Sequence, residues 1–377
     1  MSIPFNIPVI LGSETDRISE AIASKKLSGN GRFTKRCQKL FRDTYGFDTA
    51  LLTTSCTDAL ELAAIICNIS PGDEVIVPSY TYPSTANAFL LRGAKLVFVD
   101  SGPDHPNLYV EQLSELITPK TKAIVPVHYA GNACDMDAIM ELKKLHGFSV
   151  IEDAAQAIGA THNSRPLGSI GDFGAFSFHD TKNINCGEGG MLCVNNKSLS
   201  DRAEIVWEKG TNRQAFLRGD IDKYGWVDIG SSYYPSELNA AFLSAQLEAV
   251  DVIQRKRVAL WNRYQENFHD IPTRGLFTIN ETPSYSSNNA HIFYVVFERA
   301  EHRHAMIQGL KSQGIGSAFH YQSLHKSTYF KEKHGTRQLP NADRFSDCLL
   351  RLPLYYDLSL SEIDEVCASF EALISKL

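Results

Sequence analysis

The sequence predicts an α/β protein with a large domain built on a mainly parallel sheet, followed by a smaller α+β domain. Three observations lead to this fold class. Short apolar strands alternate with helical segments over the first half of the chain, which is typical of a parallel sheet covered by helices. From about residue 250 the alternation gives way to a mixture of strands and helices. The chain has 377 residues, enough for two domains, and we place their boundary between residues 248 and 249.

The first half of the chain supplies the elements of the predicted large domain. Helical spacing first covers residues 33–45, after a probable loop at 26–31. Apolar, β-branched runs then predict strands at 51–53, 74–78, 96–100, 123–128, 148–151 and 175–178. Helices are predicted between them at 58–66, up to 91, near 110–117 and near 136–146.

The second half predicts a long loop, a linking helix and the smaller domain. Residues 209–226 are rich in Gly, Arg and aromatic residues, which indicates a functional loop. A long helix is expected from Ser236 to about Tyr264, joining the two domains. The last helix begins with a capping box formed by Ser359 and Glu362. Between the linking helix and the last helix we expect strands at 293–297 and 315–320 and helices at 302–313 and 343–350.

Composition excludes several classes of protein. The 37 basic and 43 acidic residues are well mixed and give a net charge of −6, so the sequence has no basic footprint for nucleic acid or acidic lipid. No apolar run approaches the roughly 18 residues of a membrane span, and the N-terminus lacks a basic signal region. The 8 cysteines contain no CxxC pair, which argues against a zinc site or a disulfide framework. We therefore expect a soluble, cytoplasmic protein.

The stretch from Ile151 to Met191 carries the strongest functional signal. Asp153 ends a predicted buried strand, and Gln156 follows three residues later. Ser177 and Lys182 lie at and just beyond the end of another strand, before a Gly-rich turn at 187–190. The carboxyl ends of strands in open α/β sheets are where ligands bind. An Asp for a pyridine nitrogen, a Ser for a phosphate and a Lys for a Schiff base are the parts of a pyridoxal phosphate site.

Simpler explanations exist for each of these residues taken alone. A lone Asp after a strand is usually a helix N-cap, and a lone Lys in a loop is usually solvated. Thr57 lies where a strand turns into a helix, and such hydroxyl residues either cap the helix or bind an anion at its positive end. Tyr82 and His128 follow strand ends, where an aromatic ring either packs in the core or stacks on a flat cofactor.

Two other kinds of site find little support. His320 and His325 lie five residues apart, but no HExxH pattern or acidic cluster accompanies them, so a metal site is not predicted. Glycines 168, 171 and 174 have GxxGxxG spacing, which is not the dinucleotide fingerprint, and no Walker A sequence exists. The sequence therefore argues against a nicotinamide or nucleoside-triphosphate enzyme.

Several motifs together resemble one known family. They are DAAQ at 153–156, FSFHDTK at 176–182, GEGG at 187–190, PGDEVI at 71–76, PSYTY at 78–82, VPVHYAG at 125–131 and RLPL at 351–354. With them the chain resembles, essentially from end to end, the DegT/DnrJ/EryC1/StrS family of sugar aminotransferases. These are pyridoxal-phosphate enzymes of fold type I. The resemblance implies a large domain with a mostly parallel seven-stranded sheet flanked by helices.

The resemblance also implies roles around the cofactor ring. Lys182 is the Schiff-base lysine and, once displaced, the acid and base of the proton shift. Asp153 keeps the pyridine nitrogen protonated, so that the ring can accept electrons. Gln156 lies beside the phenolic oxygen, and Tyr82 stacks on the face of the ring. Some relatives carry His in place of the lysine and catalyse dehydration; this chain keeps Lys182, which favours transamination.

The resemblance also implies which residues bind the phosphate of the cofactor. Ser177, Thr57 and the backbone N–H of Asp58 hold it. In many relatives an Asn from the neighbouring subunit also reaches the phosphate, and the aligned position in this chain is Ser232, whose hydroxyl can donate. Family members are usually homodimers with shared active sites, so a homodimer is expected.

The substrate is implied by a closer likeness within the family. Residues 55–57, 208–213, 228–233 and 320–321 resemble members that make dTDP-4-amino-4,6-dideoxygalactose for surface polysaccharides such as enterobacterial common antigen or O-antigen. The implied acceptor is dTDP-4-keto-6-deoxyglucose, with L-glutamate as amino donor. We expect Arg213, His320 and Tyr321 to contact the sugar nucleotide.

Three alternatives to this substrate and function stay open. The acceptor could be a 3-keto dTDP-sugar or a UDP-4-keto-sugar, since only the pocket would differ. A non-catalytic sugar-nucleotide-binding scaffold is a further possibility.

Overall fold

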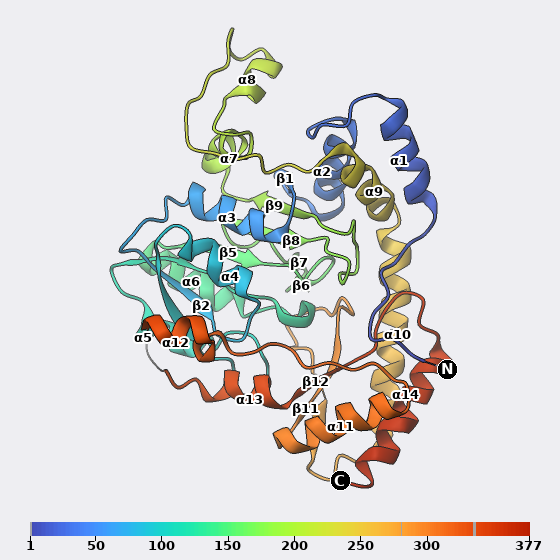
Figure 1. Cartoon of the computed structure of the whole chain (residues 1–377). Helices are drawn as coiled ribbons and strands as arrows, with labels where there is room; N and C mark the ends of the chain where they lie inside the picture. The colour runs from blue at the N-terminus through green and yellow to red at the C-terminus, as the bar shows by residue number, and fades with distance from the viewer. Residues whose placement is uncertain (1, 280, 335–336) are drawn as a thin grey trace.

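A computed structural model describes residues 2–279, 281–334 and 337–377, with the side chain of residue 334 left out (Figure 1). Its large sheet confirms the predicted fold class. Seven strands of the described chain pair in the order β1-β9-β8-β5-β4-β2-β3, and β9 alone runs antiparallel to its neighbours. Their bounds are β1 Thr49–Thr53, β2 Glu74–Pro78, β3 Lys95–Val99, β4 Thr121–Ile124, β5 Ser149–Asp153, β8 Phe173–Ser177 and β9 Gly190–Val194.

Side chains that alternate along each strand divide the core between the two faces of this sheet. In β2, Val75 and Val77 are buried on one face while Ile76 is buried on the other. The first face is covered by α3 (Cys56–Ile66), α4 (Pro83–Leu90) and α7 (Ser200–Trp207). Five further helices of the large unit lie on the side of the other face: α1 Ser13–Ala23, which packs on α9, α2 Arg32–Tyr45, α5 Leu113–Leu116, α6 Met136–His146 and α9 Glu237–Glu248.

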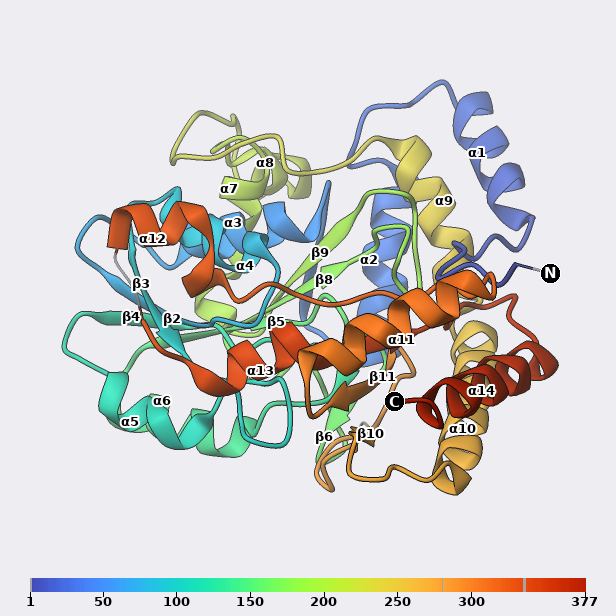
Figure 2. The same cartoon turned by 60° about the horizontal axis from the view of Figure 1, so that its bottom comes forward.

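A second, antiparallel sheet forms the smaller C-terminal part, as predicted. Its order is β10-β11-β12, with β10 Phe277–Ile279, β11 Phe293–Phe297 and β12 Leu349–Leu352. Figure 2 shows the helices around it: α10 Val250–Asp270, α11 Ala300–Ser312, α13 Pro340–Cys348 and α14 Leu360–Ile374. The capping box of Ser359 and Glu362 starts α14 as expected. Two short strands, β6 Thr161–His162 and β7 Arg165–Pro166, form a separate hairpin.

Several predicted elements were wrong in part. The helix expected at 343–350 ends at Cys348, just before β12 begins, and the strand expected at 123–128 ends at Ile124. The linking helix is two helices, because Ala249 leaves helical geometry (φ −103°, ψ 9°) between α9 and α10. Residues 315–320 form only isolated bridges, from Ile315 to Ile3 and from Ala318 to Arg351, so they are not a strand. The loop at 209–226 contains a short helix, α8 Arg213–Arg218.

The ends of the chain pack across the predicted domain boundary. Ile3 pairs with Ile315, so the N-terminal segment lies against the C-terminal part. Conversely, α12 (Thr328–His334) reaches back over the large sheet, where the Phe330 ring packs 4.7 Å from that of Phe98 (Figures 1 and 2). The break at Ala249 coincides with the boundary we placed at 248/249, which stays a prediction.

Because β9 alone runs the other way, the carboxyl ends of the other six strands meet at one edge of the sheet. The turn into α3, the start of α4 and the segments after β5 and β8 lie along this edge. Ligands bind at this edge in open α/β sheets.

Candidate active site

A cavity of about 980 Å³ opens at this edge of the sheet. That size is in the range of small-molecule and cofactor sites. Eight predicted site residues line it: Thr57, Tyr82, Asp153, Gln156, Ser177, Lys182, His320 and Tyr321. They come from five segments far apart in the sequence, so the fold brings together most of the residues that the motifs indicate.

Lys182 and Asp153 place a buried amine and a buried carboxyl group within this cavity. Burial lowers the pKa of the Lys182 amine, and the positive charge of Arg351 lowers it further, while Asp153 acts in the opposite direction. Among the described residues, none hydrogen-bonds to this amine. Burial raises the pKa of Asp153, although its carboxylate accepts hydrogen bonds from Thr85 Oγ1 at 2.7 Å and the Ala155 N–H at 3.2 Å. A cation placed against Asp153 would relieve the cost of burying its charge.

Gln156, Tyr321 and His320 form a linked wall of the cavity. The Gln156 carbonyl oxygen accepts the Ala130 N–H at 2.6 Å, and its amide nitrogen therefore donates to the Tyr321 hydroxyl at 2.9 Å. The His320 ring lies 3.5 Å from the Tyr321 ring, and its Nδ1 hydrogen-bonds to the Tyr129 hydroxyl at 3.0 Å. Burial lowers the pKa of His320 well below its ordinary value, so its imidazole is neutral at pH 7.

Tyr82 stands at the rim of the cavity with 59% of its surface exposed. It caps α4 with extended backbone geometry, and its ring lies 6.1 Å from that of Tyr321. An exposed ring at a cavity mouth is available to pack against a flat ligand. His128, the other aromatic candidate, is instead fully buried and does not line the cavity.

The N-terminus of α3 forms the anion-binding corner of the cavity. Ser55 caps the helix by accepting the Asp58 N–H at 3.0 Å, and the Thr57 hydroxyl donates to Ser84 at 2.8 Å. Gly190, at the start of β9, lets the backbone of Ser55 pack closely against that strand, because a Cβ at Gly190 would lie 2.3 Å from the Ser55 backbone. Ser177 ends β8 beside it. Helix N–H groups and hydroxyls together suit a phosphate.

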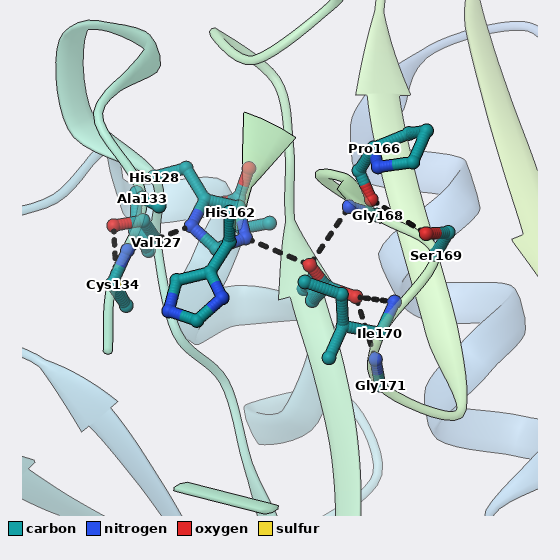
Figure 3. Close-up of polar contacts among 12 residues, drawn as sticks. Val127, His128, Ala133, Cys134, His162, Pro166, Gly168, Ser169, Ile170 and Gly171 are labelled. Carbon is teal, nitrogen blue, oxygen red and sulfur yellow. Dashed lines mark hydrogen bonds and ion pairs between the residues drawn. The ribbon is translucent and has the colours of Figure 1, made fainter. Parts of the chain in front are cut away.

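A buried hydrogen-bond network holds the strand end that carries Asp153 (Figure 3). The fully buried Glu152 carboxylate accepts the backbone N–H groups of Gly168, Ile170 and Gly171 at 2.6–2.8 Å. His128 Nε2 lies 2.9 Å from the same carboxylate. His128 Nδ1 accepts the Cys134 N–H at 3.2 Å, so Nε2 carries the proton and donates. The backbone N–H groups of the GxxGxxG segment thus bind the carboxylate of Glu152.

This network predicts a large loss of stability when Glu152 becomes glutamine. The amide would place an NH₂ donor against groups that are themselves donors, leaving a buried polar group unsatisfied. Glu152→Gln should lower the free energy of unfolding by about 3 kcal/mol, measured by urea denaturation. The exposed Glu141, which pairs with Lys144, provides the control: Glu141→Gln should change that free energy by less than about 0.5 kcal/mol. Equal effects would contradict the role of the network.

Arg213 and Ser232 lie outside the cavity of their own chain. Arg213 begins α8 and pairs with Glu208 at 2.7 Å. Ser232 is exposed and forms a bridge with Glu208, so two of the segments that carry the closer likeness, 208–213 and 228–233, pack together. They form the base of an arm, residues 209–231, which Figure 1 shows projecting from the body of the molecule at α8. Within one chain, the structure therefore does not bring Arg213 and Ser232 together with the eight residues that line the cavity.

Sequence analysis missed many of the lining residues, among them Phe5, Asn6, His291 and Thr85. Phe5 and Asn6 belong to the N-terminal segment that pairs near Ile315, a contact across some three hundred residues for which no motif exists. Thr85 follows the PSYTY motif in the first turn of α4, and its position at a helix start was a usable signal. Arg351 belongs to the RLPL motif, to which no role in the site was given.

Comparison of the chain with known protein families and structures agrees with this fold and site. The model of the DegT/DnrJ/EryC1/StrS aminotransferase family matches residues 9–371. The chain belongs to this family. The predicted enzyme class, a pyridoxal-phosphate-dependent sugar aminotransferase, is thereby confirmed, and so is the predicted cofactor.

Individual relatives match along almost the whole chain. SpsC, a spore coat polysaccharide biosynthesis protein of Bacillus subtilis (strain 168), is 34% identical over 99% of this chain and 97% of its own. The aminotransferase TlmJ from Streptoalloteichus hindustanus has a TM-score of 0.91 at 28% identity, with both chains fully covered. Spr1654 from Streptococcus pneumoniae, described as a sugar aminotransferase, has a TM-score of 0.91 in its PMP form at 26% identity, covering 100% and 98%.

The residues in hand fit pyridoxal phosphate. Three groups meet at one cavity: the buried Asp153 carboxylate, the Lys182 amine and the N-terminus of α3, where Gly190 leaves space that a Cβ would fill. Within the part of the chain that the structure describes, Asp153 has no ion pair and the Lys182 amine has no hydrogen bond. Within the described residues, no cluster of three or more metal-ligating side chains occurs. No helix of that part of the chain is long and apolar enough to cross a membrane.

Proposed function

We propose that this aminotransferase moves an amino group from L-glutamate to the 4-keto carbon of dTDP-4-keto-6-deoxyglucose, giving dTDP-4-amino-4,6-dideoxygalactose. The observation that carries the amino-transfer part is that Lys182 and Asp153 line one cavity of about 980 Å³. The sugar-nucleotide part rests on family membership and on the likeness of residues 208–213, 228–233 and 320–321.

The cofactor, when bound, supplies an electron sink for the carbanion formed during amino transfer. Lys182 would bind its aldehyde carbon, and the lowered pKa of the amine keeps a larger share of it neutral and nucleophilic. Asp153 would hold the ring nitrogen protonated, with Thr85 fixing the carboxylate. Gln156 is oriented by Ala130 and Tyr321 to meet the ring's oxygen.

The remaining proposed contacts divide between phosphate and substrate. Thr57, Ser177 and the Asp58 N–H would hold the phosphate at the start of α3. Tyr82 would cover the face of the ring from the cavity rim. Once freed from the cofactor, Lys182 would carry the proton between the two carbons of the transfer. The neutral His320 and the Tyr321 hydroxyl would bind sugar hydroxyls.

An absorption experiment tests this function. Purified protein loaded with pyridoxal phosphate should lose its visible band when L-glutamate is added. The band should return on adding dTDP-4-keto-6-deoxyglucose, and NMR of the product should show a 4-amino galactose configuration. If the visible band returned only with a 3-keto dTDP-sugar or a UDP-4-keto-sugar, that sugar would be the amino acceptor instead. A protein that takes up no chromophore would overturn the proposal in favour of a sugar-nucleotide-binding scaffold.

We further propose that the protein is a cytoplasmic homodimer in which the arm of one subunit contributes residues to the cavity of the other. The arm exposes large apolar side chains, among them Trp226 at 83% and Val227 at 55% of their surface. Such a patch suits a protein interface. The eight cysteines are free, as expected in a reducing compartment.

Subunit mixing tests whether the arm acts in trans. Arg213→Ala should raise the KM for the sugar nucleotide about 10-fold or more, because a charge-assisted contact is lost, and leave the KM for glutamate within about 2-fold. Mixing this variant with the inactive Lys182→Ala protein under exchange conditions should restore part of the sugar-nucleotide affinity, since a hybrid holds one cavity with Lys182 and an intact partner arm. Equal effects on the KM values of both substrates would contradict the assignment of Arg213 to the sugar nucleotide. If mixing restored no sugar-nucleotide affinity, active sites shared between subunits would be contradicted.

A further inference from the structure

The proposed function gives no role to His291, a buried imidazole just before β11 that lines the cavity. Its Nδ1 lies 2.8 Å from the side-chain oxygen of Asn183. The amide nitrogen of Asn183 is a donor here, because it meets the Asn289 carbonyl at 2.9 Å and the Gln254 side-chain oxygen at 2.8 Å. The oxygen of Asn183 therefore faces the ring, so Nδ1 carries the ring proton and Nε2 carries a lone pair.

The lone pair on Nε2 is free to accept a hydrogen bond. Among the described residues, none hydrogen-bonds to this nitrogen, and it is not shut off from the open space that the cavity provides. Burial lowers the pKa of His291 well below its ordinary value. The positive charges of Lys182, Arg257 and Arg351 lower it further. The ring is therefore neutral at pH 7, and an acceptor among positive charges suits a cationic donor.

The backbone around His291 fixes where the ring points. Ala290 has a φ of +52°, in the left-handed region that side chains other than glycine rarely adopt. The buried Arg257 donates to the carbonyls of Ala290 at 3.1 Å and His291 at 3.0 Å. The side-chain oxygen of Asn289 accepts the His291 N–H at 3.1 Å. A strained backbone persists only where its surroundings hold it, and such residues cluster at functional sites.

The amine of Lys182 is the cationic donor that this acceptor can serve. Asn183 directly follows Lys182 in the chain, so one loop carries the amine and holds the ring of His291. The charge of Lys182 lowers the pKa of His291, which places the two groups within electrostatic reach. Among the described residues, none hydrogen-bonds to the Lys182 amine, and its flexible four-carbon stem lets it move. Arg257 and Arg351 instead donate to backbone carbonyls.

We propose that His291 is a positioning residue for Lys182, whose ammonium donates a hydrogen bond to His291 Nε2 while the amine is free of the cofactor. This rests on the proposed role of Lys182 in amino transfer. In that role Lys182 takes a proton from one carbon and returns it to another. The hydrogen bond would hold the charged amine in place between these two steps. The proton stays on the Lys182 nitrogen, and no bond forms or breaks at His291.

Other groups act on the same ammonium and stay in place when His291 is changed. Burial lowers the pKa of the Lys182 amine, Cys56 and Asp153 act in the opposite direction, and Arg351 lowers it further. A hydrogen bond to the charged form favours that form. Substitution of His291 therefore isolates the contribution of one acceptor.

Two amide side chains separate the roles of the two ring nitrogens. Asparagine can keep a donor near the position of Nδ1 and its bond to Asn183, but it leaves nothing at the position of Nε2; glutamine can place an acceptor there but loses the donor to Asn183. His291→Asn should slow the donor half-reaction about 10- to 100-fold and leave the KM values for glutamate and keto-sugar within about 3-fold. His291→Gln should keep the rate within about 3-fold of wild type. Stopped-flow absorbance measures these rates.

The control for this test is His304→Asn, in α11 on the exposed surface, which should behave as wild type. If His291 only supported Asn183, the order of the two variants would be reversed, and that result would overturn the proposal. So would an effect of His291→Asn that is confined to the KM for the keto-sugar, because the ring would then bind the sugar and not the amine.

The second test needs no amino transfer. Trace labelling with acetic anhydride at pH 7, followed by peptide mass spectrometry, measures how much of the Lys182 amine is neutral in cofactor-free protein. Loss of the acceptor disfavours the ammonium, so Lys182 should be labelled about 3-fold faster or more in His291→Asn than in wild type. Lys256, over the Tyr356 ring and outside the cavity, should be labelled equally in both proteins. Equal or slower labelling of Lys182 in the variant would overturn the proposal.

The two tests together separate this inference from the proposed function. Thermal unfolding of each variant checks that it is folded. If His291→Asn does not fold, a donor half-reaction slowed more than about 10-fold in a folded His291→Gln would overturn the proposal. Faster labelling of Lys182 in His291→Asn, combined with no spectral response of the loaded wild type to glutamate, would support the hydrogen bond and refute the proposed role of Lys182 in amino transfer.

Discussion

Replacing Lys182 with alanine is expected to abolish amino transfer, lowering kcat by about 10⁴-fold or more. The physical reason is that, in the proposed function, this one amine would be both the covalent anchor of the cofactor and the carrier of the transferred proton. The variant should also fail to retain the cofactor covalently. Mass spectrometry after borohydride reduction should show the cofactor attached to wild type and absent from Lys182→Ala.

The matched control for that experiment is Lys256→Ala. Lys256 lies over the Tyr356 ring, outside the cavity, and its loss should leave both the rate and the covalent attachment unchanged. Amino transfer that survives in Lys182→Ala would refute the assignment. Sugar-nucleotide binding and cellular function that are both unaffected by the change would favour a scaffold.

The second large effect is expected for Asp153→Asn, which should slow the donor half-reaction by about 10²- to 10⁴-fold. Asparagine keeps the size of the side chain and an acceptor for Thr85, but it removes the negative charge that would keep the ring nitrogen protonated. Stopped-flow absorbance measures the rate. Asp137→Asn, on the exposed surface and paired with Arg165, should leave the rate unchanged. A rate for Asp153→Asn within about 3-fold of wild type would contradict the proposed role.

The same substitution has a pH-dependent consequence in the cofactor-free protein. Burial raises the pKa of Asp153 above its ordinary value of 3.8. Since the native state then holds the proton more tightly than the unfolded state, the contribution of this carboxyl to stability falls as pH rises from 3.8 through the native pKa. The unfolding free energy of wild type relative to Asp153→Asn should therefore decrease with pH over that window, as measured by urea denaturation. An increase would contradict the direction of the shift.

Much of the fold follows from local sequence. β-branched apolar runs form β2 and β11 within the predicted bounds, because alternating side chains can be buried on two faces only in extended chain. The capping box at Ser359 was predictable because its two hydrogen bonds lie within four residues. The central site residues, Asp153 and Lys182, were also predictable, since strand ends mark the ligand-binding edge of a parallel sheet.

What the sequence alone determined, then, is the fold class, the family and the residues that follow the strands. Only the tertiary structure decided which distant groups complete the site. Phe5 and Arg351 meet across the whole length of the chain, and Glu237 in α9 accepts three backbone N–H groups at the start of α2. Such contacts depend on how the elements pack, and no local pattern encodes them, because they join residues that only the folded chain brings together.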